Sequence, residues 1–318
     1  MPQSSKKSPR EELDARGYCV IPLVTKEEVQ ELLRDISELK PDDNFAPSAN
    51  SSFEKTYHLT FLDTNFEYKR RAKELITETF GEKIKAILPD FRILDKNFFI
   101  KPPGTGELNV HRNWTFVRDQ RVRTFTVWCP LVDVDETNGT IQLVTGSHRF
   151  CREVVSPTVA TFFEGFQSAI IDEYSTPIEM KAGEALIFDD QIIHWSGNNM
   201  SDKPRPAVVM ACVPVDEETV FYFSDMKPGS TLLDVYKIDY RFFDDFSALK
   251  LANRPQGLES YGTFELRDHR PISYEEFVDL KRRYDKGLER SEMQSLSTIQ
   301  DVERTFFGKL FDRFLGPK

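Results

Sequence analysis

A series of short apolar segments, separated by turn residues, runs through the middle of the chain and constrains its fold most. From about Leu94 each segment has the length of a single strand. Many short strands at even spacing are typical of an antiparallel sandwich or barrel. The segments that we expect to be strands are 98–101, 108–111, 124–129, 141–144, 185–189, 192–195, 207–213 and 220–223.

Helical patterns flank this series. Thr25 and Glu28 form a capping-box motif, after which apolar residues such as Val29 and Leu32 recur at helical spacing until Pro41. A second helix is expected over 67–87, and the chain beyond about residue 240 has a mostly helical pattern. Short strands flanked by helices indicate a mainly β fold of the jelly-roll, cupin-like kind.

The chain has neither an internal repeat nor a Gly/Ser linker, so we expect a single domain over residues 1–318. It is predicted to consist of a flexible tail (1–12), a helical part (13–92), a β core (93–225) and a mostly helical extension (226–318). Segments 41–66 and 152–180 are less regular than their neighbours. At least one of them is expected to cover the mouth of the barrel as a lid.

Charge and cysteine content limit the possible partners and compartments. The net charge of −10 disfavours binding to nucleic acid. The four cysteines form no CxxC pair, which is typical of reduced thiols in the cytoplasm. No apolar run reaches the roughly 18–20 residues of a membrane span, and the N-terminus lacks the apolar region of a signal peptide. We expect a cytoplasmic protein with a small-molecule substrate; the oligomeric state is not indicated.

Two of the five histidines lie at predicted strand ends in a pattern that suits iron. His111 is followed two residues later by Asn113, His194 comes much later, and Arg205 lies eleven residues beyond it. An oxygen-activating Fe(II) site uses two imidazoles and one carboxylate and leaves positions open. Residues i and i+2 of a strand face the same side, so one strand can supply two ligands. An arginine can then bind the far carboxylate of a chelating 2-oxo acid.

At these positions the chain resembles the phytanoyl-CoA dioxygenase family of Fe(II)/2-oxoglutarate-dependent oxygenases, over roughly residues 14–225. The resemblance rests on motifs in a fixed order: Gly17-Tyr18, Lys101-Pro102-Pro103-Gly104, His111, Trp128, Asn138-Gly139, Gly146-Ser147-His148, His194-Trp195-Ser196-Gly197-Asn198 and Arg205. It implies a double-stranded β-helix that binds Fe(II), 2-oxoglutarate and O2.

The resemblance also implies roles for individual residues. His111 and His194 would bind the metal, and Arg205 would bind the C5 carboxylate of 2-oxoglutarate. Trp128 matches a family position beside this cosubstrate, whereas Lys101 either contacts the cosubstrate or only ends a strand. The implied reaction decarboxylates 2-oxoglutarate to succinate and CO2 while a substrate C–H bond is hydroxylated or otherwise oxidised.

Asn113 departs from the family pattern, because the family has a carboxylate there. An amide oxygen can bind metal as the third ligand but is neutral. Nearby Asp119, Asp189 and Asp190 are alternative ligands, although a structural role is expected for Asp189 and Asp190. The alternative to an active dioxygenase is a catalytically impaired relative, natural or engineered, that binds a 2-oxo acid or substrate without turnover.

Overall fold

The computed structural model describes residues 8–46, 56–151, 153–157, 163, 165–224, 231–244, 246–247, 253–266 and 272–286. Helix α1 (Pro9–Arg16) opens this part, and Ser8 caps it together with Glu11. The prediction of a flexible tail over 1–12 is therefore wrong for residues 9–12. The capping box offers partners to the free N–H groups of the first helical turn, so these residues are helical. Residues 1–7 lie outside the described part.

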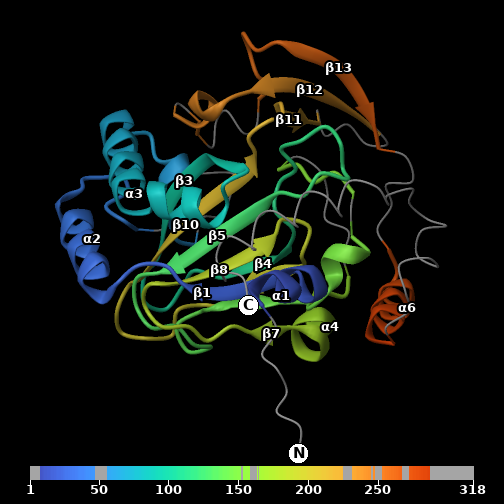
Figure 1. Cartoon of the computed structure of the whole chain (residues 1–318), viewed down its shortest axis with the longest axis horizontal. Coiled ribbons are helices and arrows are strands. Elements are labelled where there is room, and N and C mark those ends of the chain that lie inside the picture. Colours follow the sequence, from blue (N-terminus) through green and yellow to red (C-terminus); the bar gives the residue numbers. More distant parts are fainter. Residues whose placement is uncertain are drawn as a thin grey trace, which may run out of the picture.

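Two helices cover one face of the main sheet, α2 (Lys26–Glu38) and α3 (Phe66–Ile87) (Figure 1). The predicted capping box at α2 is confirmed, since Thr25 accepts the Glu28 N–H and Glu28 accepts the Thr25 N–H. The apolar stripe of α2, including Val29 and Leu32, is buried in a cluster shared with α3 and the sheet. Burial of this stripe anchors the helices to the barrel.

Two antiparallel sheets form the β core. The larger has the order β1-β8-β5-β10-β3-β2 and the smaller the order β4-β9-β6-β7. The strands of the larger sheet are β1 (Tyr18–Pro22), β8 (Glu184–Asp189), β5 (Phe125–Pro130), β10 (Arg205–Pro214), β3 (Phe91–Lys101) and β2 (His58–Leu59). The strands of the smaller are β4 (Leu108–His111), β9 (His194–Ser196), β6 (Ile141–Leu143) and β7 (Thr176–Pro177). This is the expected jelly roll, or double-stranded β-helix.

A third sheet follows the β core, in the order β11-β12-β13, and lies at the top of Figure 1. Its strands are β11 (Thr219–Phe223), β12 (Leu232–Ile238) and β13 (Ser260–Glu265), and helix α6 (Tyr274–Asp285) comes after it. The prediction of a mostly helical extension over 226–318 is wrong for β12 and β13. Alternate residues of β12, such as Leu233 and Val235, are buried against β11, and this period of two favours strands. The predicted division of the chain at residues 92/93 and 225/226 stays a prediction.

Short helical segments follow several of the strands: η1 (Thr60–Leu62) follows β2, η2 (Ser147–Arg149) follows β6, and η4 (Tyr240–Phe243) follows β12 of the third sheet. The region predicted as loop or lid over 152–180 contains α4 (Gln167–Ala169), η3 (Ile170–Tyr174) and β7 among its described residues. No helix in the described ranges is long and apolar enough to cross a membrane.

Strand alternation turns one row of β3 side chains toward the interior. In register with β10, Lys101 lies opposite Arg205, Asn97 opposite Val209 and Asp95 opposite Ala211. Residues two apart on a strand share a face, so these charged and polar side chains of β3 and β10 lie on the same face of the larger sheet. The smaller sheet supplies its own side chains to the same clefts, which places a site between the two sheets.

Candidate metal and cosubstrate site

His111 and His194 lie side by side on neighbouring strands. Strands β4 and β9 pair antiparallel with His111 directly opposite His194, and the two ring centroids are 4.1 Å apart. His194 is buried, and its ring also packs against Phe188. The register of one strand pair therefore brings together two residues that are 83 positions apart in the sequence.

Backbone carbonyls hold both rings in one tautomer. Nδ1 of His111 lies 2.7 Å from the Asn109 oxygen, and Nδ1 of His194 lies 3.0 Å from the Ile192 oxygen. A carbonyl only accepts, so each Nδ1 carries the hydrogen and each Nε2 keeps a lone pair. Burial lowers the pKa of both imidazoles, and His111 lowers that of His194 further. Neutral rings with free Nε2 atoms are the form that binds metal.

Asn113 lies two residues after His111, and hydrogen bonds fix the orientation of its side-chain amide. Nδ2 donates to Thr126 Oγ1 at 2.7 Å and to Asp190 Oδ1 at 3.0 Å. Thr126 in turn donates to the same Asp190 oxygen at 2.6 Å. Because a carboxylate accepts, the NH2 group must face Asp190. The Asn113 oxygen is then the atom that remains for a metal, and Asn113 lines a cleft together with both histidines.

The three nearby acids have different environments. Asp119 is partly exposed and paired with Arg121, and Asp189 is buried and bonded to Arg123. Asp190 alone of the three contacts Asn113, and burial raises its pKa to about 6 despite hydrogen bonds from Thr124, Thr126 and Asn113. Asp119 and Asp189 are thus engaged with arginines, whereas Asp190 lies directly behind Asn113.

No carboxylate in the described residues completes a triad with the two histidines. The one group of three His, Cys, Asp or Glu residues found there with ligand atoms within 4.8 Å of one another is Asp43, His58 and Asp63. Both ring nitrogens of His58 are already used, by Asp43 at 2.7 Å and by the Tyr68 hydroxyl at 2.6 Å. That cluster is a hydrogen-bonded group whose ring nitrogens are occupied, and the candidate metal site has an amide where the family has a carboxylate.

Arg205 is a buried cation that lies beside Trp128. Its side chain lies at the start of β10, and the residue is only 3% exposed. In the described structure its Nε and Nη1 atoms are buried without a hydrogen-bond partner. Its guanidinium stacks 5.4 Å from the ring centroid of Trp128, and burial lowers its pKa to about 10. Buried guanidinium N–H groups are normally paired, so this arrangement fits an anionic ligand.

Lys101 is a second buried cation at the same end of the cleft. Its Nζ donates to Ser196 Oγ at 2.7 Å and to the Gly197 oxygen at 2.6 Å. Burial and the nearby Arg205 lower the pKa of Lys101 to about 6. Gly139 belongs to the Asn-Gly turn noted in the sequence and packs closely here, since a Cβ at Gly139 would lie 2.4 Å from the Gly197 oxygen. A carboxylate bound at Arg205 would offset the charge of that guanidinium and favour the protonated form of Lys101.

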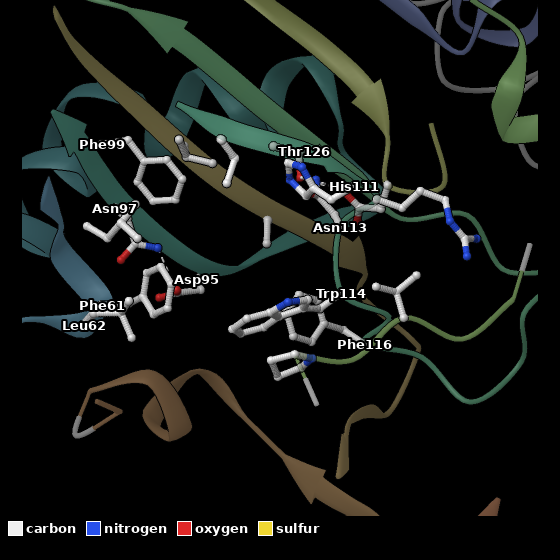
Figure 2. Close-up of a pocket in the computed structure, with 18 of the residues that line it drawn as sticks. Phe61, Leu62, Asp95, Asn97, Phe99, His111, Asn113, Trp114, Phe116 and Thr126 are labelled. Atoms are coloured by element: carbon white, nitrogen blue, oxygen red, sulfur yellow. Dashed lines mark hydrogen bonds between the residues drawn. The ribbon is translucent and has the colours of Figure 1, made fainter. Parts of the chain in front are cut away.

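A cavity of about 480 Å³ adjoins the histidine cleft, with His111, Asn113 and Thr126 shared by both. Figure 2 shows His111, Asn113 and Thr126 at one end of this cavity and Asp95, Asn97 and Phe61 at the other. Much of the lining is aromatic: Phe61, Phe99, Trp114, Phe116, Phe163 and Phe243. An apolar cavity beside a metal site can hold an organic substrate and exclude water from it.

The structure brings together all six residues singled out in the sequence. His111, Asn113, His194, Arg205, Trp128 and Lys101 all line one cleft between the two sheets. The hydrogen bond of Asp190 to Asn113 was not predicted, because Asp190 lies 77 residues away and its only sequence signal was proximity to His194. Asp95 and Asn97 were also missed, since the predicted strand began at residue 98 whereas β3 begins at Phe91.

The residues present fit a metal ion with a chelating dicarboxylate. Two imidazole Nε2 atoms and one amide oxygen supply neutral nitrogen and oxygen donors, and Arg205 offers unpaired N–H groups to a carboxylate. A jelly roll of this kind is the fold of the 2-oxoglutarate-dependent oxygenases. A carbocyclase of this class from nogalamycin biosynthesis, SnoK, matches 68% of this chain and 87% of its own with a TM-score of 0.51 and 17% identity.

The chain belongs to the phytanoyl-CoA dioxygenase family, whose model matches residues 13–207. The phytanoyl-CoA dioxygenase domain-containing protein 1 of Danio rerio is 30% identical over 146 residues, which are 43% of this chain and 50% of that protein. Phytanoyl-CoA dioxygenase 1 of Oryza sativa subsp. japonica is 23% identical over 146 residues, 43% of this chain and 52% of that protein. The match thus spans about half the length of these curated relatives.

Proposed function

We propose that this protein is an Fe(II)/2-oxoglutarate-dependent dioxygenase that oxidises a small, largely apolar molecule. The observation that carries the proposal is the buried guanidinium of Arg205, whose Nε and Nη1 have no hydrogen-bond partner among the described residues. It lies in the cleft that also holds two neutral imidazoles. A buried cation of this kind costs free energy unless an anion binds to it. Membership of the family supports 2-oxoglutarate as that anion.

The residues of the cleft would divide the work as follows. The Nε2 atoms of His111 and His194 and the Asn113 oxygen would hold the metal, and Arg205 would bind the far carboxylate of 2-oxoglutarate. When bound, Fe(II) and 2-oxoglutarate supply the oxygen chemistry, with succinate and CO2 as the products of the cosubstrate. Trp128 would hold the Arg205 guanidinium in position by stacking. The aromatic cavity would exclude water and orient the substrate.

The neutral Asn113 favours a second candidate, a relative that binds 2-oxo acid without turnover. An amide ligand leaves Fe(II) with one negative charge fewer than a carboxylate does. In this chain the Asp190 carboxylate accepts a hydrogen bond from the Asn113 amide at 3.0 Å. This hydrogen bond makes the amide oxygen more negative, and so replaces part of the negative charge that a carboxylate ligand would supply. This contact supports the active enzyme over the impaired relative.

Succinate release separates the two candidates. The purified chain is incubated aerobically with Fe(II), ascorbate and 2-oxoglutarate, without added substrate, and succinate is measured over time. The proposal expects slow succinate formation, which Arg205→Ala should abolish. Arg241→Ala is the control and should preserve it, because the Arg241 side chain is 72% exposed and pairs with Asp239. If 2-oxoglutarate binds in the presence of metal but no succinate forms, the impaired relative is the correct reading.

We also infer that the protein works in a reducing compartment such as the cytoplasm. All four cysteines are buried and free, and burial raises the pKa of the thiols of Cys19, Cys129 and Cys151 to about 12. Thiols with such pKa values remain protonated and unreactive. Stability that is unchanged by a strong reductant in thermal unfolding would agree with this inference, whereas destabilisation would indicate disulfides.

A further inference from the structure

Two buried polar side chains mark the end of the aromatic cavity that lies away from the histidines. Asp95 and Asn97 lie two residues apart on β3 and face the cavity, and they are 8% and 6% exposed. Figure 2 shows them on the opposite side of the cavity from His111 and Asn113, close to Phe61 and Leu62. Neither residue belongs to the proposed metal and cosubstrate site.

This pair has unused capacity to accept hydrogen bonds. Asn97 Nδ2 donates to Asp95 Oδ2 at 2.7 Å, which fixes the orientation of both groups. The remaining oxygen of the amide, Asn97 Oδ1, is buried without a hydrogen-bond partner in the part of the chain that the structure describes. Asp95 Oδ1 pairs with Lys73 Nζ at 3.2 Å, so among the described residues the Asn97 oxygen is the acceptor of this pair that is left over. Buried acceptors of this kind normally have a partner.

The register of the main sheet gives the distance between this pair and the metal end. Asp95 lies opposite Ala211 on β10, and Ala211 lies opposite Thr126 on β5. Thr126 contacts Asn113. Adjacent strands are about 4.8 Å apart, so two strand spacings place Asp95 roughly 10 Å from Thr126. A ligand that reaches from one end to the other therefore spans about the length of a ring with a short side chain.

The charges of the cavity disfavour an anion. Three acids line it, Asp95, Asp190 and the exposed Glu107, whereas the one cation among the described lining residues is Arg112. The Arg112 guanidinium donates to Gln191 Oε1 at 2.8 Å and pairs with the Glu153 carboxylate at 3.1 Å. Burial raises the pKa of Asp95, and Lys73 opposes that rise. The cavity therefore provides acceptors and negative charge but no free cation for a carboxylate or phosphate.

We propose that Asp95 and Asn97 form a subsite that accepts hydrogen bonds from a hydroxyl or amino group of a largely apolar substrate. The group that donates the hydrogen bond would lie about two strand spacings, roughly 10 Å, from the end of the cavity where Thr126 contacts Asn113. This inference deepens the proposed function and rests on it for the position of the reacting carbon. It selects neutral or basic ring-containing molecules and rejects carboxylates and acyl-CoA thioesters, whose charged groups would meet unpaired acceptors.

Four probes that share a phenylbutyl body test the subsite without any turnover. These are 4-phenylbutan-1-ol, its methyl ether, 4-phenylbutylamine and 4-phenylbutyrate, each titrated into the full chain by calorimetry. The ether lacks the O–H donor of the alcohol and carries one additional methyl group. We expect the alcohol to bind about fivefold more tightly than the ether, as one hydrogen bond allows, and the carboxylate to bind most weakly. Comparison of the alcohol with the amine decides between a hydroxyl and an amino group.

Two variants and one control locate the effect. Asn97→Leu and the β-favouring Asn97→Val remove the unpaired oxygen, and in each the alcohol and the ether should bind equally. Phe99→Leu, two residues along the same face of β3, should weaken both probes while their ratio remains about fivefold. Equal affinities in the parent chain, no binding of either probe at its solubility limit, or an unchanged ratio in both Asn97 variants would overturn the subsite.

The two proposals fail separately. Probe affinities require neither iron nor oxygen, so a chain that releases no succinate but prefers the alcohol would refute the dioxygenase and retain the subsite. A chain that releases succinate but binds alcohol and ether equally would retain the dioxygenase and refute the subsite.

Discussion

Asn113 differs from the aspartate of the family pattern in one group, an amide NH2 in place of a carboxylate oxygen. This NH2 group makes the hydrogen bonds of the Asn113 side chain to Thr126 and Asp190. An aspartate at position 113 would place a carboxylate oxygen where the amide nitrogen now donates to Asp190 at 3.0 Å. Two carboxylates at this distance repel each other unless a metal ion or a proton lies between them. The amide removes this repulsion and leaves a polarised oxygen on the side of the histidines.

The role of Asp190 leads to the first prediction, on metal affinity. Asp190→Asn removes the charge that orients and polarises Asn113, so affinity for Mn(II), measured by calorimetry without oxygen, should fall about 10–100-fold. Asp119→Asn is the matched control, since Asp119 pairs with Arg121 on the surface, and it should change nothing. An unchanged affinity in Asp190→Asn would mean that Asp190 has only a structural role.

A second prediction moves the carboxylate to the family position. Asn113→Asp alone should tighten Mn(II) binding by at least tenfold, about 1.4 kcal/mol, even though the new carboxylate is repelled by Asp190. The double variant Asn113→Asp with Asp190→Asn keeps the hydrogen bond between the two side chains and removes the repulsion. It should therefore bind metal more tightly than either single variant, and the double-mutant cycle measures the coupling. If neither variant with Asp at position 113 changes the affinity, the residue at 113 does not contact the metal.

Arg205 gives the third prediction, on cosubstrate affinity. Arg205→Ala leaves the distal carboxylate of 2-oxoglutarate buried without its cation, so binding in the presence of Mn(II) should weaken by about 2–5 kcal/mol. Arg205→Lys keeps the charge but loses the fork of donors and should fall between parent and Ala. Calorimetry measures all three, and parent-like affinity in Arg205→Ala would remove Arg205 from the site.

For individual residues, the sequence indicated which side chains could form the site better than it indicated which of them are in contact. His111, His194 and Arg205 were singled out because iron and a dicarboxylate require particular donors in a particular order, and they line one cleft. Asp190 was expected to be structural, because the sequence does not show which side chain lies behind Asn113. The acceptors Asp95 and Asn97 were missed, because the inward face of β3 is determined by pairing with β10 rather than by local pattern.

Among the elements, the register of β4 against β9 creates the histidine pair. A slip of one residue would turn one ring to the other face of its sheet. The predicted strand 108–111 coincides with β4, yet nothing local in the sequence specifies that His111 lies opposite His194. Local signals sufficed for α2, whose capping box was found. They failed for β12 and β13, which become strands through pairing with β11.

The segments over the cavity are the elements for which we predict motion. Described residues of both predicted lid segments line the cavity, including Tyr57, Phe61, Val154 and Ser156. Substrate loops of this kind exchange faster than core strands until a ligand orders them. Hydrogen exchange of residues 56–62 and 153–157 should slow when Mn(II) and 2-oxoglutarate are added together, with β5 as the internal control. Protection equal to that of β5 in both states would exclude a lid.

For the whole molecule, the cleft lies between the two sheets, so ligands that bind there should raise the free energy of unfolding. Mn(II) and 2-oxoglutarate, each at about 100 times its dissociation constant, together add roughly 5 kcal/mol, which is about 8 °C in the unfolding temperature of a chain of this size. Thermal unfolding should show this shift in the parent, its reversal by a chelator, and its absence in His194→Ala. An equal shift in His194→Ala would place the metal elsewhere.

The most direct test of the central claim is the visible charge-transfer absorption that Fe(II) gives when a 2-oxo acid chelates it. Under anaerobic conditions the parent chain with Fe(II) and 2-oxoglutarate should develop this band. His194→Ala should lack it, and Arg205→Ala should require far more 2-oxoglutarate to produce it. A parent chain without the band, or a band of equal strength in His194→Ala, would contradict the proposal that His111, His194 and Asn113 hold iron for 2-oxoglutarate.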